Sequence, residues 1–280
     1  MRKYYLHLLL FTSSGLAQSE FIVNQSKFYQ VENPSAFGLN FTNKIGVLYN
    51  TATISQDNQL DDKYFFGALP FQNQRFALGI DLISYEIQNV DLISTNARLN
   101  FVYVIQMNSS IYFLPSISLG FNNVSFQLSD FIFEDYINKR TGFISSETTD
   151  PLGQRIGRVN YLDLGASLLV HSDTFFVGLS FFHLNQPNVS FEKEGDENLP
   201  IALSFQGGVE FDINPYQRGL LPDNSYLFLY NSIRFLDQRT HLNLTQEVQL
   251  NSLSLNLNQR LSLYDNLNFN SLGFGVGIAV

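Results

Sequence analysis

Residues 93–107 read ISTNARLNFVYVIQM, and almost every second side chain, from Ile93 to Met107, is apolar. The side chains between them are polar at first and become apolar only near the end of the stretch. Neighbouring side chains of a β-strand point to opposite faces of a sheet, so this alternation predicts a long strand with one apolar face. The spacing of three or four residues that an amphipathic helix requires is not present in this stretch.

The same alternation recurs along the chain and predicts an all-β fold. Strands in soluble proteins usually span about five or six residues, whereas a tilted strand needs roughly 9–11 to cross a bilayer. The predicted strands reach that greater length, so we expect a transmembrane antiparallel β-barrel over residues 43–280. We predict twelve strands, near residues 43–55, 61–70, 75–89, 91–107, 110–128, 156–171, 174–186, 199–213, 224–235, 238–250, 252–264 and 267–280.

Charged residues occupy the second face of these strands. An arginine facing lipid at the middle of a bilayer costs about 2–4 kcal/mol, and an acidic residue costs less, so we expect them to line a polar lumen. The connections alternate between tight turns and longer loops, with 129–155 and 187–198 the longest on the outer side and 214–224 an exception on the periplasmic side. The charged residues are Arg98, Glu210, Asp212, Arg234 and Glu247.

The N-terminus has the pattern of a secretory signal peptide. Arg2 and Lys3 precede an apolar run at 4–11, and small residues at Gly15 and Ala17 fit a cleavage site. The run is shorter than the ~20 residues that a transmembrane helix needs. We expect residues 1–17 to be removed, residues 18–42 to form a lead-in or plug, and the mature chain to be exported.

Composition excludes other classes of protein. The chain has no cysteine, so disulfides do not hold the fold together. Its net charge is −9, and the loss of two positive charges with Arg2 and Lys3 makes it −11. Nucleic-acid binding needs a basic face, so we expect no nucleic-acid partner.

No motif points to catalysis, a cofactor or a metal. The histidines His171, His183 and His241 have no ligand spacing between them, and no spacing marks a serine nucleophile of the outer-membrane phospholipase type. The acidic run 192–197 lacks a calcium-binding register and is interpreted as a solvated loop. We therefore expect a non-enzymatic protein with no catalytic, cofactor-binding or metal-binding residues.

The stretch FFVGLSFFHLNQPNVSF, residues 175–191, ends an alternating strand with polar residues. Pro187 lacks an N–H and is expected to end the strand. Asn185 and Gln186 offer amide donors that can hold a peptide backbone at the rim of the barrel. We consider His183, Asn185, Gln186 and Pro187 a candidate partner-binding rim; the alternative is that these residues only close the strand and pack against a plug.

Two stretches carry a resemblance to a known family. YLDLGASLLVHSDTFFVGLSFFHLNQP at 161–187 is similar to the central signature of the PorP/SprF family of the type IX secretion system, and NPSAFG at 33–38 is similar to the motif near the mature start of that family. The resemblance spans nearly the whole mature chain. The residues that match the family motifs are Asn33, Pro34, Gly38, Asp163, Gly165, Gly178 and Ser180.

The resemblance implies an outer-membrane protein without enzymatic activity that takes part in type IX export. Its implied partners are outer-membrane lipid, other type IX secretion subunits and exported proteins, which some family members hold by their C-terminal sorting domains. The outer loops and the rim would contact the exported partner. An alternative class is a channel for hydrophobic or small solutes, and a third is a soluble β-sandwich whose apolar faces pack together.

The sequence departs from the family in two ways. It has no tryptophan, and it stops at Val280, where family members continue. Related barrels are expected to have fourteen strands, so we predict that two strands are missing from a truncated C-terminus. A closed barrel with 43–55 paired to 267–280 would contradict this prediction, and a gap between them would support it.

Overall fold

The computed structural model describes residues 27–55, 58–87, 92–126, 157–192, 195–217, 220–237, 239–263 and 267–278. The signal-peptide prediction for 1–17 and the outer loop 129–155 lie outside these residues. In the part that is described, no helix is long and apolar enough to cross a membrane.

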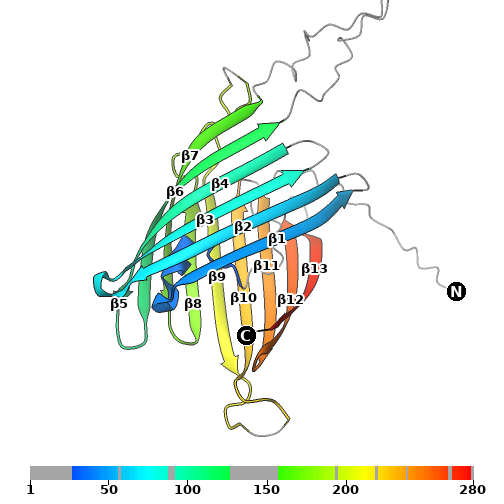
Figure 1. The fold of residues 1–280 in the computed structure, drawn as a ribbon. Helices are drawn as coiled ribbons and strands as arrows, with labels where there is room; N and C mark the ends of the chain where they lie inside the picture. Colours follow the sequence, from blue (N-terminus) through cyan, green and yellow to red (C-terminus); the bar gives the residue numbers. More distant parts are fainter. Residues whose placement is uncertain are drawn as a thin grey trace, which may run out of the picture.

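The fold is one curved antiparallel sheet that wraps around a short N-terminal helix (Figure 1). Strands that follow one another in the chain are paired, with one exception. Both β4 and the two-residue strand β5 pair with β6, and β5 pairs with the part of β6 that extends past the end of β4. Two short 3-10 helices are present: η1 (Pro34–Phe41) lies inside the curve of the sheet, and η2 (Gln72–Gln74) lies in a turn between two strands. The strands are β1 (Lys44–Ser55), β2 (Asn58–Phe71), β3 (Phe76–Ile87), β4 (Leu92–Tyr103), β5 (Ile105–Gln106), β6 (Tyr112–Phe126), β7 (Arg158–His171), β8 (Phe175–Phe182), β9 (Ala202–Asp212), β10 (Ser225–Leu236), β11 (Arg239–Leu250), β12 (Leu253–Leu263) and β13 (Leu267–Ile278).

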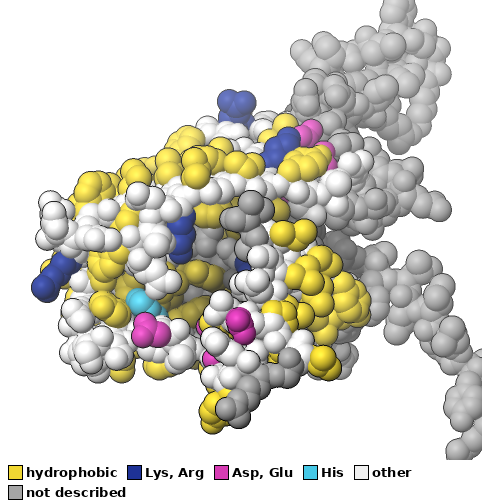
Figure 2. Space-filling model, turned by 60° about the horizontal axis from the view of Figure 1, so that its bottom comes forward, with side chains coloured by type: hydrophobic (Ala, Val, Ile, Leu, Met, Phe, Trp, Pro, Cys, Tyr) yellow, Lys and Arg dark blue, Asp and Glu magenta, His cyan; other side chains and the backbone are white. Residues whose placement is uncertain are grey.

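The two faces of the sheet differ in the way that the alternation predicts. Leu99 on the outer face is 55% exposed, whereas its neighbour Asn100 on the inner face is fully buried. Figure 2, which brings one end of the sheet forward, shows hydrophobic side chains over the outer wall and basic side chains in the hollow. The predicted all-β class with an antiparallel barrel sheet is therefore confirmed, and the soluble sandwich, which needs buried apolar faces, is wrong.

Short turns gather at one end of the sheet, which we call the short-turn end. Asn108 makes the turn before β6 because its Oδ1 accepts hydrogen bonds from the N–H groups of Ser110 and Ile111, at 2.9 and 2.8 Å. Ser172 plays the same part before β8, where its Oγ accepts from Phe175 N–H at 3.3 Å. The opposite end, which we call the long-loop end, carries the connections at 127–157 and 183–201. The exception predicted at 214–224 is also present at the short-turn end.

One predicted strand is divided in two. We expected a continuous strand over 91–107, but β4 ends at Tyr103 and β5 begins at Ile105. The register places Tyr103 opposite Pro115 of β6, which has no N–H to donate to the ladder. On the other side of β4, Val104 donates its N–H to Arg75 O at 2.8 Å and so continues the pairing with β3. The interruption is thus confined to the β6 side, where Pro115 lacks a donor.

The first and last strands are unpaired along their outer edges. Within the described residues, no ladder joins β1 to β13, so the sheet is not closed. The open edge does not contradict the prediction of two further strands and a truncated C-terminus, which stays a prediction.

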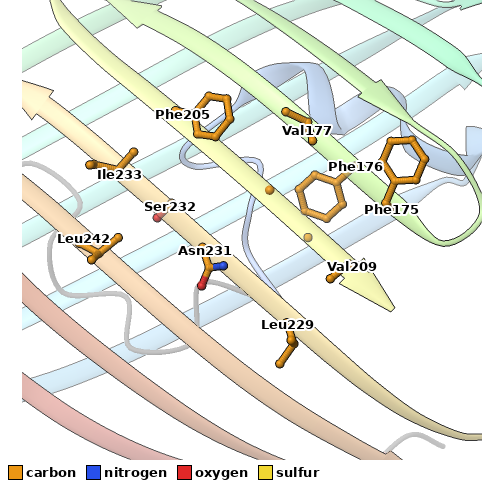
Figure 3. A pocket seen from close by; sticks show the side chains of 12 residues that line it. Phe175, Phe176, Val177, Phe205, Val209, Leu229, Asn231, Ser232, Ile233 and Leu242 are labelled. Atoms are coloured by element: carbon orange, nitrogen blue, oxygen red, sulfur yellow. The ribbon is translucent and has the colours of Figure 1, made fainter. Parts of the chain in front are cut away.

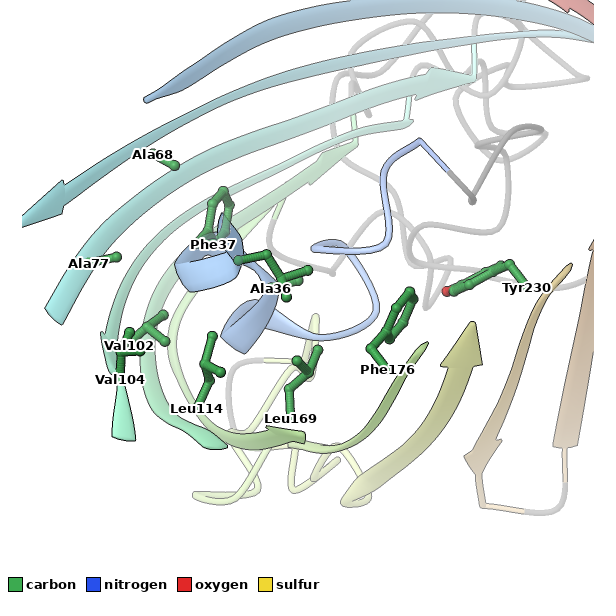
Figure 4. Packing of buried hydrophobic residues seen from close by; sticks show 11 residues of the cluster. Ala36, Phe37, Ala68, Ala77, Val102, Val104, Leu114, Leu169, Phe176 and Tyr230 are labelled. Carbon is green, nitrogen blue, oxygen red and sulfur yellow. The ribbon is translucent and has the colours of Figure 1, made fainter. Parts of the chain in front are cut away.

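A compact apolar cluster lies inside the short-turn end. η1 contacts β2, β3, β4, β6 and β7, and its residues Ala36 and Phe37 lie among inward side chains of these strands (Figure 4). Gly79 on β3 leaves the space that Phe37 fills, because a Cβ at position 79 would lie 2.4 Å from the Phe37 ring. The sheet residues of the cluster are Ala68, Ala77, Val102, Val104, Leu114, Leu169, Phe176 and Tyr230.

Candidate functional site in the lumen and at its rim

The N-terminal segment 27–41 lies within the lumen, and Asn33 attaches it to the sheet. The Asn33 Nδ2 donates to Leu168 O on β7 at 3.0 Å and to Leu179 O on β8 at 3.5 Å. Its Oδ1 accepts from Ser35 N–H at 3.0 Å and caps η1, with Pro34 in the first turn. Asparagine is suited to this position because one side chain supplies both a donor and an acceptor.

Gly178 makes the approach of Asn33 to β8 feasible. A Cβ at position 178 would lie 2.3 Å from Asn33 Nδ2, so any other residue type would displace the Asn33 amide. Gly38 has the same property at the other end of the segment, where a Cβ would lie 2.8 Å from side-chain atoms of Leu114 and Val102. The two glycines thus allow the segment and the sheet to approach at these positions.

Three buried serines join the segment to β6 and β7. Ser35 Oγ lies 3.1 Å from Ser116 Oγ and 2.9 Å from Ser167 Oγ, and the last two are 2.5 Å apart. Ser35 N–H also donates to Ser167 Oγ at 3.1 Å. Among the described residues, the hydrogen bonds of these hydroxyls go to one another and to backbone, without a histidine or carboxylate. The cluster therefore positions the segment and lacks the base that nucleophilic catalysis needs.

Further along the lumen, two arginines meet over one aromatic ring. Arg98 on β4 and Arg234 on β10 lie 5.4 and 5.2 Å from the centroid of Phe182, at the end of β8. Arg98 forms a buried ion pair with Asp81, at 2.5 Å between Nη2 and Oδ2. Arg234 pairs with Glu32 of the N-terminal segment at 3.0 Å. These side chains form a bar from β4 to β10, and we refer to Arg98, Phe182 and Arg234 as the crossbar.

A small chamber of about 70 Å³ lies beside the crossbar, with Val31 of the segment among its lining residues. In it, His183 Nδ1 lies 3.0 Å from Asp163 Oδ2. Asn122 Oδ1 accepts a hydrogen bond from Asn96, whereas its buried Nδ2 has no partner among the described residues. The chamber is lined by groups of both charges and by amides, as expected for a polar lumen.

Most of the segment is buried. Tyr29 packs on Phe176 with ring centroids 5.4 Å apart, and burial raises the pKa of its hydroxyl. Lys27 forms an ion pair with the buried Glu247 of β11. The segment therefore contacts strands on both sides of the lumen.

The rim at 183–187 has a geometry that the sequence did not reveal. β8 ends at Phe182, not at Pro187 as expected, because His183 adopts a left-handed backbone with φ of 59°. Past the end of β8, the side-chain amide of Asn185 bonds to the backbone of β7. Leu164 N–H donates to the Asn185 Oδ1 at 2.9 Å, and the Asn185 Nδ2 donates to Leu162 O at 2.7 Å. The Asn185 amide is thus held by β7, while Gln186 is exposed.

The predicted motif residues lie in the N-terminal segment and on β7 and β8, and some of them meet. Asn33, Pro34 and Gly178 meet at the junction described above. Gly165 lies next to β8, where a Cβ would be 3.1 Å from Phe181 O, and Ser180 is buried nearby on the inner face. Sequence reasoning placed Arg98 and Arg234 in the lumen but missed Phe182 between them, because the alternation gives no sign of contacts across the lumen.

Comparison with known protein families identifies the chain. The model of the family described as type IX secretion system membrane protein PorP/SprF matches residues 17–280. The chain belongs to the PorP/SprF family. No curated protein matches the chain. Among the residues that resembled PorP/SprF in the sequence, Asn33, Pro34 and Gly178 lie at the junction of the N-terminal segment with β7 and β8, whereas Asp163 contacts His183.

Membership of the PorP/SprF family makes the chain a component of the type IX secretion system. The family comprises membrane proteins, and the apolar outer face of the sheet is compatible with a membrane environment. In the described residues, no group of three or more His, Cys, Asp or Glu side chains is arranged to hold a metal ion.

Proposed function

We propose that this protein is an outer-membrane barrel that takes part in the export or surface attachment of proteins through their C-terminal sorting domains. The observation that carries the proposal is the N-terminal segment in the lumen, together with membership of a secretion-system family. A barrel with a filled lumen is suited to hold a partner at its rim and loops.

The orientation of the chain follows from the same proposal. Residues 1–17 act as a signal peptide for export, and the short-turn end faces the periplasm, as is usual for outer-membrane barrels. The long-loop end then faces the cell exterior. Loops 129–155 and 187–198 and the rim at His183–Pro187 are the proposed contact surface for the exported protein.

Side-chain exposure supports a division of roles within the proposed rim. Gln186 and Leu184 are exposed, and Leu184 is 43% accessible. Asn185 contributes indirectly, because its hydrogen bonds to β7 hold the turn in place. Leu184 and Gln186 are therefore the direct contacts, and Asn185 is a positioning residue.

The test is co-purification of exported protein with the full-length chain from native outer membranes. Replacing 129–155 by a flexible linker of the same length, or replacing Leu184 and Gln186 by alanine, should lower the amount of exported protein recovered. Tyr216→Ala is the matched control, because Tyr216 is 81% exposed at the opposite end. Equal recovery from the rim variant, the loop variant and the control would contradict the proposal.

A solute channel is the second candidate, and the unpaired edges of β1 and β13 favour it. An opening in the wall gives apolar solutes a route between bilayer and lumen. The buried charges of the crossbar and the N-terminal segment count against it, because they occupy the lumen with polar groups and packed side chains. Conductance of the purified protein in planar bilayers, or a bound apolar ligand in the purified protein, would favour the channel.

A further inference from the structure

Two hollows of the molecule differ in the side chains that line them. The larger, of about 320 Å³, lies in the wall of the sheet, and Figure 3 shows apolar side chains such as Phe205, Ile233 and Leu242 around it. The smaller is the chamber of about 70 Å³ beside the crossbar, where most lining residues are polar or charged. Directed polar contacts give a ligand site its specificity, and the chamber has the residues to supply them.

The chamber lies close to the long-loop end of the sheet. Ser94 in its wall is near the start of β4 at Leu92, and Asn122 is near the end of β6 at Phe126. His183, which belongs to both the chamber and the rim, directly follows the end of β8. The space has room for several water molecules or for one small group of a ligand that reaches it from this end.

Two buried polar groups of the chamber lack a partner within the part of the chain that the structure describes. Asn122 is only 3% exposed, and its Oδ1 accepts from Asn96 whereas its Nδ2 donates to no group. Asp163 is also buried, with Oδ2 3.0 Å from His183 Nδ1 and Oδ1 without a donor. A Cβ at Gly120 would lie 3.4 Å from Asp163 Cβ and 3.6 Å from Asn122 Nδ2, so the two groups flank the same glycine.

The charges around the chamber select against charged ligands. Arg98 and Arg234 line it, and each already pairs with a carboxylate. A cation would face these two guanidinium groups and would leave the Asn122 amide without an acceptor. An anion would face the carboxylate of Asp163 and would leave its free oxygen without a donor.

We propose that the chamber binds a neutral carboxamide group. Its NH₂ donates to Asp163 Oδ1, and its carbonyl oxygen accepts from Asn122 Nδ2, so one uncharged group completes both residues. Water also donates and accepts, and binding therefore means that the carboxamide displaces ordered water from the chamber.

Two sources can supply the carboxamide in the native membrane. One is an Asn or Gln side chain of the exported protein that reaches the chamber past His183, and this source rests on the proposed function. The other is a free small molecule that carries the same group. Purified protein tests the chemistry of the chamber, and native complexes separate the two sources.

The chain has no cysteine, so a single introduced thiol can report on the chamber. Ser94→Cys places the thiol in the chamber wall, and Ser110→Cys, at an exposed turn of the short-turn end, is the matched control. Purified full-length protein is labelled with iodoacetamide and, separately, with iodoacetate, which carries a carboxylate in place of the amide. The ratio of the two rates cancels the reactivity of the thiol itself. We expect this ratio to be about tenfold higher for Ser94→Cys than for Ser110→Cys.

Reversible probes and two further variants test the same contacts. Acetamide should slow the labelling of Ser94→Cys, whereas acetate and methylammonium should not. Asn122→Leu and Asp163→Asn, each combined with Ser94→Cys, remove one of the two partners and should lower the ratio towards that of the control; either variant suffices if the other does not fold. Equal ratios in all of these proteins, without protection by acetamide, would overturn the proposal and assign only ordered water to the chamber.

Native complexes then identify the source of the carboxamide. Protection of the Ser94→Cys thiol while exported protein is bound, with lower recovery of that protein for Asn122→Leu, assigns the group to a side chain of the exported protein. Protection that is lost on dialysis, with unchanged recovery, assigns it to a free molecule. If no form of the chain recovers exported protein, the proposed function fails, whereas the ratio of rates on purified protein still decides the chemistry of the chamber.

Discussion

The two halves of the lumen satisfy the same alternating sequence in different ways. On the side of β2 to β7, the inner face near the short-turn end is apolar and is covered by η1, with Phe37 packed over Gly79. On the side of β11 and β12, the inner face is made of small polar residues that bond between the two strands and along β12. Thr245 Oγ1 donates to Asn258 Oδ1 at 2.8 Å, and Asn258 Nδ2 donates to Asn256 Oδ1 at 2.7 Å.

The difference shows that period-two alternation specifies which side chains point inward but not how the inward face is completed. The first half packs its apolar inner face against a segment from another part of the chain, whereas the second half bonds its small polar residues to one another and meets that segment at the Lys27–Glu247 pair. The first half should therefore lose more stability on substitution, because its packing and buried charges have no substitute. The following variants test this comparison by unfolding in urea with detergent or lipid present.

The largest loss is expected for Asp81→Ala on β3. Asp81 is fully buried and accepts from Arg98 and, at 2.7 Å, from Asn100, so its removal leaves a buried arginine unpaired. The free energy of unfolding should fall by about 4 kcal/mol. Glu86→Ala, on the same strand, is the control, since its 3.8 Å pair with Lys63 is exposed and is worth under about 1 kcal/mol. Similar losses for the two variants would contradict the buried ion pair between Asp81 and Arg98.

Phe37→Ala should lower the free energy of unfolding by about 3 kcal/mol, because it empties the space above Gly79. The same change should expose residues 27–42 to added protease, which can be followed by mass spectrometry of the cleaved chain. A protease-resistant segment in this variant would show that η1 is held by other contacts.

Gly178→Ala should cost about 1–2 kcal/mol, because the new methyl group overlaps with Asn33 Nδ2. Adding Asn33→Ala removes the overlap, so the double variant should lose less than the sum of the two single variants. The difference is measured as a double-mutant cycle. Additive losses would mean that the two positions do not touch.

The smallest loss is expected in the second half, for Thr245→Val. This change keeps the shape of the side chain but removes the donor to Asn258, so unfolding should become easier by about 1 kcal/mol. A loss as large as that of Phe37→Ala would remove the contrast between the two halves.

Much of the fold is predictable from the sequence, because the alternation of side chains is local. Each of the twelve predicted strands is present, and the division after Tyr103 has a cause, Pro115, that the sequence displays. The contacts of the site are not local. Asn33 bonds to residues 135 and 146 positions away, and no periodicity reports such a meeting.

The rim illustrates the same limit at shorter range. Asn185 was expected to offer free donors, whereas its amide is occupied by the backbone of β7. The positive φ of His183, which brings Asn185 to that edge, cannot be inferred from the presence of a histidine. One role of the motif His-Leu-Asn-Gln-Pro is thus to supply the Asn185 amide that bonds to the backbone of β7.

The ion pair between Lys27 and Glu247 joins residues 220 positions apart, and the contact between Ser35 and Ser167 spans 132. Contacts of such long range are slow to form, because a large loop of chain must close first. The N-terminal segment is therefore expected to dock late in assembly, after β11 has reached its position in the sheet.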